Sequence, residues 1–241
     1  MSVLKDRIQT DAVSLLQDLT RRNSPLRMSR TFRGMLFTQD LAPVSMGSDR
    51  CLFKGARSHL AANLGDRIYL HSPDMSEVLS ARVLEMDAKL GRFLLGDFVL
   101  TGRPWSDRSQ DRVQPRRPIR VTLRCNERSM SASLENISLI GVGLLAYKTA
   151  ERGLEPREGS PVTVDFELPI MRGRISLRGR LVNVEYPCER LACLGVHTFP
   201  DMDQARVLER YVTHRKAEIV DELDTALNSA FEPRSVKELY F

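Results

Sequence analysis

Aromatic residues, paired cysteines and long apolar runs are all scarce in this sequence. Aromatic side chains make up only 6% of its 241 residues, with a single tryptophan, Trp105, so the core must be mainly aliphatic. The four cysteines are dispersed without a Cys-x-x-Cys pair, which argues against a zinc site or a small disulfide scaffold. No run approaches the roughly 18 apolar residues of a membrane span, and charges interrupt the N-terminal segment every few residues. We therefore expect a protein of the reducing cytoplasm, without a membrane span, a signal peptide or a metal site.

Sequence signatures of catalysis are missing as well. There is no Gly-rich phosphate loop of the Walker or Rossmann type. His197 and His214 have no Ser or Cys near them in a catalytic motif, and Asp201 and Asp203 are typical of a helix N-terminus rather than of paired catalytic carboxylates. We expect no catalytic residue and no cofactor, and we predict that the protein is not an enzyme.

The charge that is present is basic and rich in arginine. The formal net charge is +5, and the densest basic cluster runs from Arg103 to Arg128, with arginine but no lysine. Arginine is preferred over lysine where a phosphate or a guanine edge is held by two parallel hydrogen bonds, or where a base is stacked. The cluster therefore indicates a binding function, and the alternative at this stage is a solvated basic linker.

Hydrophobic spacing predicts an N-terminal helix, two sets of short strands and a C-terminal helix. The first helix is expected over Val3 to Arg22, and the last from about Asp203 to Asn228. The first set of strands is expected at Phe32 to Thr38, Arg50 to Ala56, Arg67 to His71, Val78 to Met86 and Arg92 to Leu100. The second set is expected at Ile119 to Cys125, Met130 to Ile137, Gly143 to Tyr147, Pro161 to Leu168, Arg174 to Tyr186 and Leu191 to Phe199.

These elements predict a mostly β protein with two small antiparallel β-barrels and helices at both termini. The expected boundaries are an N-terminal helix in residues 1–29, a first barrel in 30–102, an arginine-rich linker in 103–118, a second barrel with the C-terminal helix in 119–230, and a tail in 231–241.

Two short motifs stand out at the start of the second set of strands. The first is R-x-x-x-R at Arg116 and Arg120, in the segment that leads into the first of these strands. The second is N-x-S-x-x-G at Asn136, Ser138 and Gly141, between two strands. Each motif alone occurs often by chance, and Asn, Ser and Gly are also ordinary turn residues. Their joint occurrence in this order and spacing is much more specific.

The two motifs resemble the paired signature of the PilZ domain. The run from Leu194 to Phe199, followed by an acidic helix start, resembles the final strand of that family, and the likeness covers about residues 112 to 215. The preceding strands resemble, in architecture only, the N-terminal barrel of YcgR-like proteins. The resemblance implies a bacterial second-messenger receptor that binds cyclic di-GMP as a ligand and acts on a protein partner in motility, polysaccharide secretion and biofilm formation, or pilus function, with flagellar motility as the first expectation.

The resemblance also implies roles for individual residues. Arg116 and Arg120, with Arg117 assisting, would contact guanine edges and phosphates, because an arginine fork matches the O6 and N7 acceptors of guanine. Asn136, where the family often has Asp, would accept guanine N–H groups. Ser138 would offer a hydroxyl, and Gly141 would let the backbone approach the ligand. Gly143 is more typical of a turn or bulge residue.

Two other functions remain open from the sequence. One is a nucleic-acid-binding β-barrel that uses the same basic segment, although few aromatic residues stand among the arginines for base stacking. The other is a PilZ-like assembly protein that has lost its ligand. The C-terminal helix also carries an apolar stripe at Ile219, Leu223 and Leu227. This stripe could be covered by Leu15, Leu16 and Leu19 of the N-terminal helix, but we expect a second subunit to cover it, in a homodimer.

Overall fold

The structure is a computed structural model. It describes the backbone of residues 2–55, 63–87, 90–102, 110–125, 128–147, 157–169 and 173–231, and the side chains of these ranges between residues 12 and 226. The first half of the predicted linker, residues 103–109, the predicted tail beyond Phe231 and the side chain of Leu227 therefore lie outside the described residues. Within the described part, no helix is long and apolar enough to span a membrane, and no cluster of side chains could hold a metal ion.

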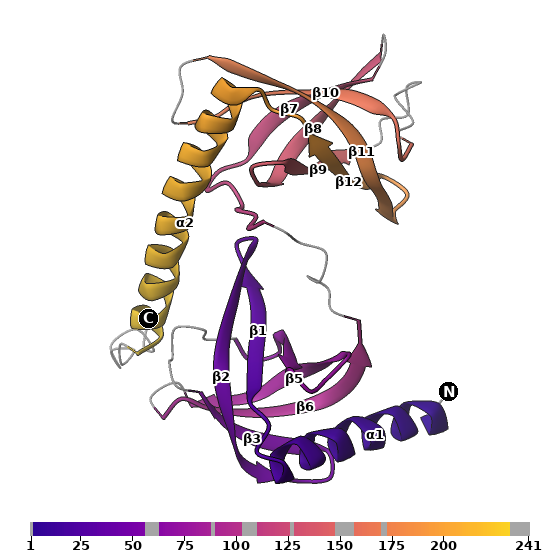
Figure 1. Cartoon of the computed structure of the whole chain (residues 1–241), viewed down its shortest axis with the longest axis vertical. Coiled ribbons are helices and arrows are strands. Elements are labelled where there is room, and N and C mark those ends of the chain that lie inside the picture. Colours follow the sequence, from indigo (N-terminus) through magenta and orange to yellow (C-terminus); the bar gives the residue numbers. More distant parts are fainter. Residues whose placement is uncertain are drawn as a thin grey trace, which may run out of the picture. The chain divides into compact units, whose positions relative to one another are not determined.

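The described strands form two closed antiparallel barrels, which confirms the predicted fold class (Figure 1). The helix α1 (Ser2–Arg21) precedes the first barrel. The strands of the first barrel are β1 (Leu26–Phe32), β2 (Met35–Met46), β3 (Arg50–Gly55), β4 (Arg67–His71), β5 (Val78–Asp87) and β6 (Arg92–Thr101). They close in the order β1-β2-β3-β6-β5-β4. The barrel thus begins at Leu26, before residue 30 where the sequence placed its start.

The apolar face of α1 packs on the first barrel. Leu16 is fully buried and Leu19 is 5% exposed, in one cluster with Phe53, Phe93 and Phe98 of the barrel strands. Leu15 packs against the same cluster. The apolar face of the N-terminal helix is therefore part of the core of the first barrel. This argues against the alternative in which Leu15, Leu16 and Leu19 cover the apolar stripe of the C-terminal helix.

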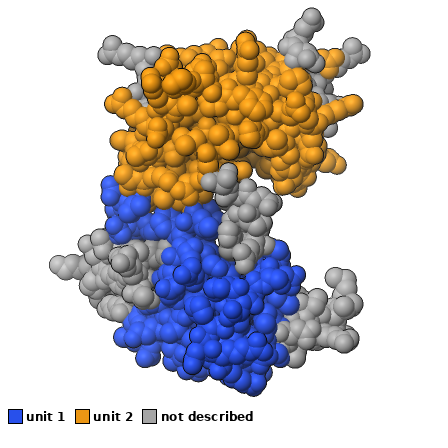
Figure 2. Space-filling view, in the orientation of Figure 1, with its two compact units in different colours: residues 1–32, 36–108, 220–241 blue, residues 33–35, 109–219 orange. Residues whose placement is uncertain are grey.

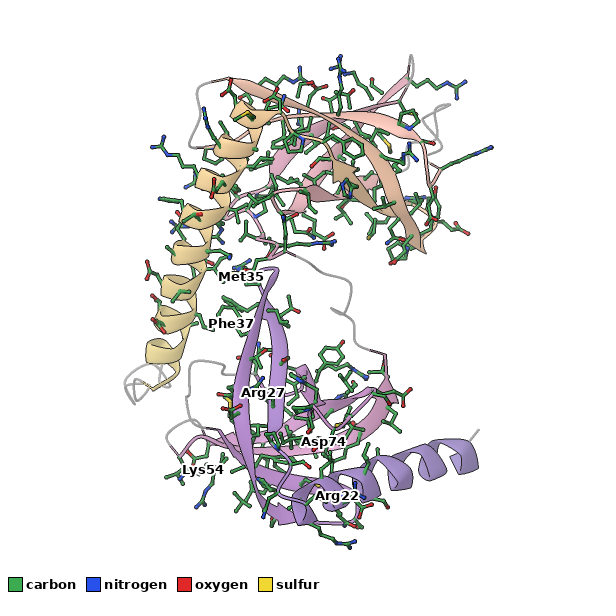
Figure 3. The ribbon with its side chains drawn as sticks, viewed as in Figure 1. Arg22, Arg27, Met35, Phe37, Lys54 and Asp74 are labelled. Carbon is green, nitrogen blue, oxygen red and sulfur yellow. The ribbon has the colours of Figure 1, made fainter. Side chains whose placement is uncertain are left out.

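The start of the first barrel differs from the prediction. The expected strand from Phe32 to Thr38 is wrong, because β1 ends at Phe32 and β2 begins at Met35. Arg33 and Gly34 form the turn between them with φ of 50° and 86°, the left-handed conformation that two-residue hairpin turns require. Arginine is unusual at such a position, and the sequence therefore gave little sign of this turn. Figure 3 labels Met35 and Phe37 along the beginning of β2.

The second barrel follows the predicted strands closely. Its strands are β7 (Ile119–Cys125), β8 (Arg128–Ile137), β9 (Gly141–Tyr147), β10 (Pro161–Glu167), β11 (Arg174–Cys188) and β12 (Leu191–Thr198). They close in the order β10-β11-β12-β9-β8-β7. Val121, Val164, Leu177 and Leu144 point inward and are fully buried, so the aliphatic core expected from the scarcity of aromatic residues is present here.

The helix α2 (Met202–Phe231) follows the second barrel. The carboxylate of Asp201 accepts a hydrogen bond from the Gln204 amide at 2.8 Å, and the Gln204 side chain accepts one from the Asp201 amide at 3.1 Å. This reciprocal pair is a capping box, and it identifies Asp201, rather than Asp203, as the N-cap of the helix.

The chain divides into two compact units, coloured in Figure 2. The first contains residues 1–32, 36–108 and 220–241, and the second contains residues 33–35 and 109–219. The turn residues Arg33–Met35 therefore group with the second barrel, and α2 contributes residues 202–219 to the second unit and its remaining residues to the first.

Candidate ligand-binding site

A short main-chain ladder joins the arginine-rich segment to the end of β8. The Val113 amide donates to the Ile137 carbonyl at 2.9 Å, and the Ile137 amide donates to the Val113 carbonyl at 3.0 Å. Val113 is fully buried, so this bridge is an anchor rather than a surface contact. Ile137 lies between Asn136 and Ser138, and the segment that leads to Arg116 therefore starts directly beside the second motif.

The three predicted arginines are exposed and point away from the core. Arg116 and Arg117 form a bend before β7, and Arg120 alternates on β7 with the buried Ile119 and Val121. Arg120 is therefore on the outer face of the barrel. Its partner on β8 is Ser133, three residues before Asn136. Among the residues that the structure describes, none forms a hydrogen bond or an ion pair with the guanidinium groups of these three arginines, so these groups are available to a ligand.

The side chain of Asn136 lies over Gly143 of the neighbouring strand. The two residues are partners across β8 and β9, next to a register shift in β8 between Leu134 and Asn136. A Cβ atom added at Gly143 would come within 2.6 Å of the Asn136 Nδ2 atom and 2.8 Å of its Oδ1 atom. Gly143 is therefore a strand residue opposite a bulge, and its missing side chain makes room for the Asn136 amide.

The Oδ1 atom of Asn136 is buried and lacks a hydrogen-bond partner in the described part of the chain. A buried acceptor without a partner costs on the order of 1–3 kcal/mol. A donor from a bound molecule would remove this cost. The Oδ1 atom of Asn136 is thus an acceptor on this face that a hydrogen-bond donor of a ligand can satisfy.

Ser138 and Gly141 form the tight connection between β8 and β9. The Ser138 amide donates to the Gly141 carbonyl at 2.8 Å, and the Ser138 hydroxyl donates to the same oxygen at 3.2 Å. Ser138 is only 4% exposed. A Cβ atom at Gly141 would lie 3.1 Å from the Val196 carbonyl oxygen of β12. In this structure both residues shape the turn that presents Asn136, which is the local role left open by the sequence.

A row of paired residues continues from Asn136 across the outer face of the second barrel, and it was not predicted from the sequence. Asn136 is paired with Gly143, Gly143 with Gly195 of β12, and Gly195 with Asn183 of β11. The flanking residues Val142, Leu144, Leu194 and Val196 point inward and are buried. Two glycines therefore form a floor between two asparagines, and the Asn136 amide lies over Gly143. Glycine inside a strand is a recognised sign of close approach to the backbone, and it could have revealed this floor.

The far end of this floor is also polar. The Asn183 Nδ2 atom donates to the Glu185 side chain at 2.9 Å, and both residues are exposed.

Burial raises the pKa of the nearby Cys193 thiol, and the carboxylates of Glu135 and Glu185 raise it further. A thiol held in its protonated form is a poor nucleophile. The arrangement offers hydrogen-bonding groups and cationic groups for binding, and it gives this cysteine no reactive character.

Comparison with known proteins finds a family model that matches part of this chain. The PilZ domain family model matches residues 106–214. The matched segment includes Arg116, Arg117, Arg120, Asn136, Ser138 and Gly141. A search of curated proteins finds no match.

Several solved structures are similar in part. Escherichia coli YcgR in complex with c-di-GMP is 15% identical, with 89% of this chain and 93% of that chain covered and a TM-score of 0.44. The Klebsiella pneumoniae MrkH–c-di-GMP complex is 13% identical, with coverages of 89% and 96% and a TM-score of 0.41. Bacillus subtilis MotI/DgrA, an inhibitor of motility, is 13% identical, with coverages of 81% and 97% and a TM-score of 0.40.

The family assignment rests on the match over residues 106–214 and on the two motifs that this segment contains. The matched segment comprises the arginine-rich lead-in, the whole second barrel and the first turns of α2. The second of the two barrels is thus the part of the chain that matches the PilZ domain family.

Proposed function

We propose that this protein is a receptor for cyclic di-GMP, bound on the outer face of the second barrel. The observation that carries the proposal is the bridge between Val113 and Ile137, which starts the arginine lead-in beside the unpartnered Oδ1 atom of Asn136. Unpaired cationic groups and an unpaired acceptor thus belong to one locality. A dianion with two guanine bases needs both kinds of group.

Each predicted residue has a distinct role in this proposal. Arg116 and Arg120 hold the O6 and N7 atoms of guanine and the phosphates, with Arg117 on the phosphate side. Asn136 accepts a guanine N–H group, which satisfies its Oδ1 atom. Ser138 and Gly141 keep the turn that places Asn136.

In the floor, the missing side chain of Gly143 leaves room for the Asn136 amide, and this amide faces a base that is bound on the outer face of the barrel. Asn183, at the opposite end of this floor, is a further ligand contact. An exposed amide there can both donate to and accept from the edge of a base.

The proposed mechanism is a shift in population between arrangements of the chain. The lead-in arginines are exposed without ligand, and binding draws them over the outer face of the barrel. The ligand therefore favours those arrangements in which the exposed bend at Arg116 and Arg117 is ordered. The protein is a cytoplasmic receptor and not an enzyme, and its output is the regulation of a partner protein. The YcgR-like order of the two barrels makes flagellar motility the first candidate pathway.

The single tryptophan provides the test of this mechanism. Trp105 precedes Arg116 in the segment predicted to link the barrels, so its fluorescence reports changes there. Titration with cyclic di-GMP is expected to change the emission in a saturable way, and GTP at the same concentration is expected to leave it unchanged. Binding without any change in emission would contradict the proposed ordering of the lead-in. A gel shift with single-stranded nucleic acid, together with no response to cyclic di-GMP, would instead support the nucleic-acid-binding alternative.

We also propose that the protein forms a homodimer, but through other residues than the sequence suggested. Ile219 is fully buried and Leu223 is only 5% exposed within one chain, so these two residues do not require a second copy to cover them. Val220 on the same helix is 42% exposed, and it is the better probe. Light scattering at micromolar concentrations is expected to show a dimer that Val220→Asp dissociates. A monomeric wild type, with and without ligand, would rule the dimer out.

A further inference from the structure

The segment that leads to the proposed ligand arginines is held by α2. The Arg215 Nε atom donates to the Gln114 carbonyl oxygen at 2.7 Å. One residue further along the helix, Lys216 forms an ion pair with Asp111. Gln114 precedes Arg116 by two positions, and the residue between them, Pro115, is buried and has a restricted φ. The position of the Gln114 carbonyl therefore limits where the chain can place Arg116.

Arg215 is an unusual residue to find in the interior. It is only 1% exposed, and its guanidinium pairs with Glu218 at 3.0 Å. Burying a guanidinium is unfavourable before any pairing, and a well-packed apolar side chain of similar size often makes the fold equally stable or more stable. The fold of α2 alone thus gives little reason for an arginine here. Its specific contact with a main-chain carbonyl of the lead-in does give one.

The main chain at Gln114 is fixed on both sides. Its amide donates to the Arg33 carbonyl oxygen at 2.7 Å, and its carbonyl accepts from Arg215. The preceding residue, Val113, is bridged to Ile137 at the end of β8. The lead-in is therefore anchored up to Gln114, whereas Arg116 and Arg117 form an exposed bend directly after the anchor.

We propose that Arg215 is a positioning residue, which fixes the Gln114 carbonyl and so presents Arg116 to the ligand. This inference rests on the ligand site proposed above. It adds that occupancy of the site is linked to α2 through the contact between Arg215 and Gln114. Any change that withdraws Arg215 from Gln114 then lowers ligand affinity, and by reciprocity the ligand stabilises this contact.

The test uses Arg215→Lys in the full-length protein. Lysine keeps the positive charge but cannot reproduce the planar guanidinium fork. Once the Gln114 carbonyl is released, Arg116 occupies its binding position in only a fraction of the molecules, so cyclic di-GMP affinity is expected to fall about tenfold or more. Arg210→Met is the matched control, because Arg210 is an exposed arginine of the same helix, and it is expected to bind like wild type.

Two readouts separate positioning from a general effect on the fold. First, the loss caused by Arg215→Lys is expected to disappear in an Arg116→Ala/Arg120→Ala background, because there is then no arginine left to position. Second, hydrogen exchange without ligand is expected to accelerate at the amides of Val113 and Gln114 and to stay unchanged in β10 and β11. If Arg215→Lys fails to fold, Glu218→Gln removes the carboxylate that orients Arg215, and it is expected to give the same pattern.

The outcomes that overturn the inference are equally specific. Wild-type affinity and wild-type exchange in Arg215→Lys would mean that the contact positions nothing. An equal loss of affinity in the double-alanine background, or faster exchange throughout the barrel, would mean that Arg215 only supports the fold. If the wild type does not bind cyclic di-GMP, the proposed function fails, and the exchange at Val113 and Gln114 still decides whether Arg215 fixes the lead-in.

Discussion

Gly143→Ala tests the role of Asn136 without changing a single polar atom. The added Cβ would meet the Nδ2, Oδ1 and Cγ atoms of Asn136 at 2.6, 2.8 and 2.9 Å. Ordinary contacts of a Cβ begin at about 3.4 Å, so either the strand or the Asn136 side chain must move. The amide is the end of a short, rotatable side chain, and it is the part that gives way. The variant should fold, but with Asn136 turned away from its place in the site.

The magnitude follows from the hydrogen bond that Asn136 is proposed to make. Losing it leaves a guanine donor unpaired, at a cost of about 1–3 kcal/mol, which corresponds to a roughly 5- to 150-fold loss of affinity. Isothermal titration calorimetry with cyclic di-GMP measures this loss directly. Gly102→Ala is the matched control, because a Cβ at Gly102 meets nothing within 4 Å.

A double-mutant cycle assigns the effect to Asn136. Asn136→Ala alone should weaken binding, and adding Gly143→Ala to it should cost nothing more, because the displaced amide is already absent. Wild-type affinity in Gly143→Ala would refute the reasoning. So would an undiminished loss in the Asn136→Ala background, since Gly143 would then act on the ligand through some other contact.

Three further predictions concern affinity and stability. Arg116→Ala and Arg120→Ala should each weaken cyclic di-GMP binding by about tenfold to more than a hundredfold at unchanged melting temperature, whereas Arg128→Ala, an exposed arginine at the other end of β8, should bind normally in the same titration. Asn136→Asp should bind as tightly as wild type or more tightly, because a carboxylate is the stronger acceptor; weaker binding would mean that this side chain faces a phosphate. Burial raises the pKa of Tyr211 to about 12, so ionisation favours the unfolded state above the ordinary tyrosine pKa of about 10. Stability should fall between about pH 10 and 12, and Tyr211→Phe should lose less stability over that interval in denaturant titrations.

Local pattern was sufficient to predict the second barrel. Alternation of the kind seen from Val162 to Leu168 fixes which side chains face inward, so the predicted strands agree with β7 to β12. The turn at Arg33 and Gly34 was not predicted. It requires the left-handed backbone conformation at two successive residues, and arginine rarely adopts that conformation. Alternation of apolar and polar residues therefore predicts strands well, but it does not predict the exact position of a tight turn.

The geometry around the candidate site depends on pairing between distant segments, and no local pattern encodes it. The Val113–Ile137 bridge and the contact between Arg215 and Gln114 join residues far apart in the sequence. Gly143 looked like a turn residue because its role becomes visible only when Asn136 stands opposite it. The residue types of the site were therefore predictable from the motifs, whereas its floor and its anchors required the register of the strands.

The most direct test of the proposed function is a calorimetric titration of the wild type and of the Arg116→Ala/Arg120→Ala variant with cyclic di-GMP. The proposed site predicts saturable binding to the wild type, a large loss of affinity in the variant and no comparable binding of GTP. Absence of binding to a folded wild type, or equal binding to both proteins, would contradict it.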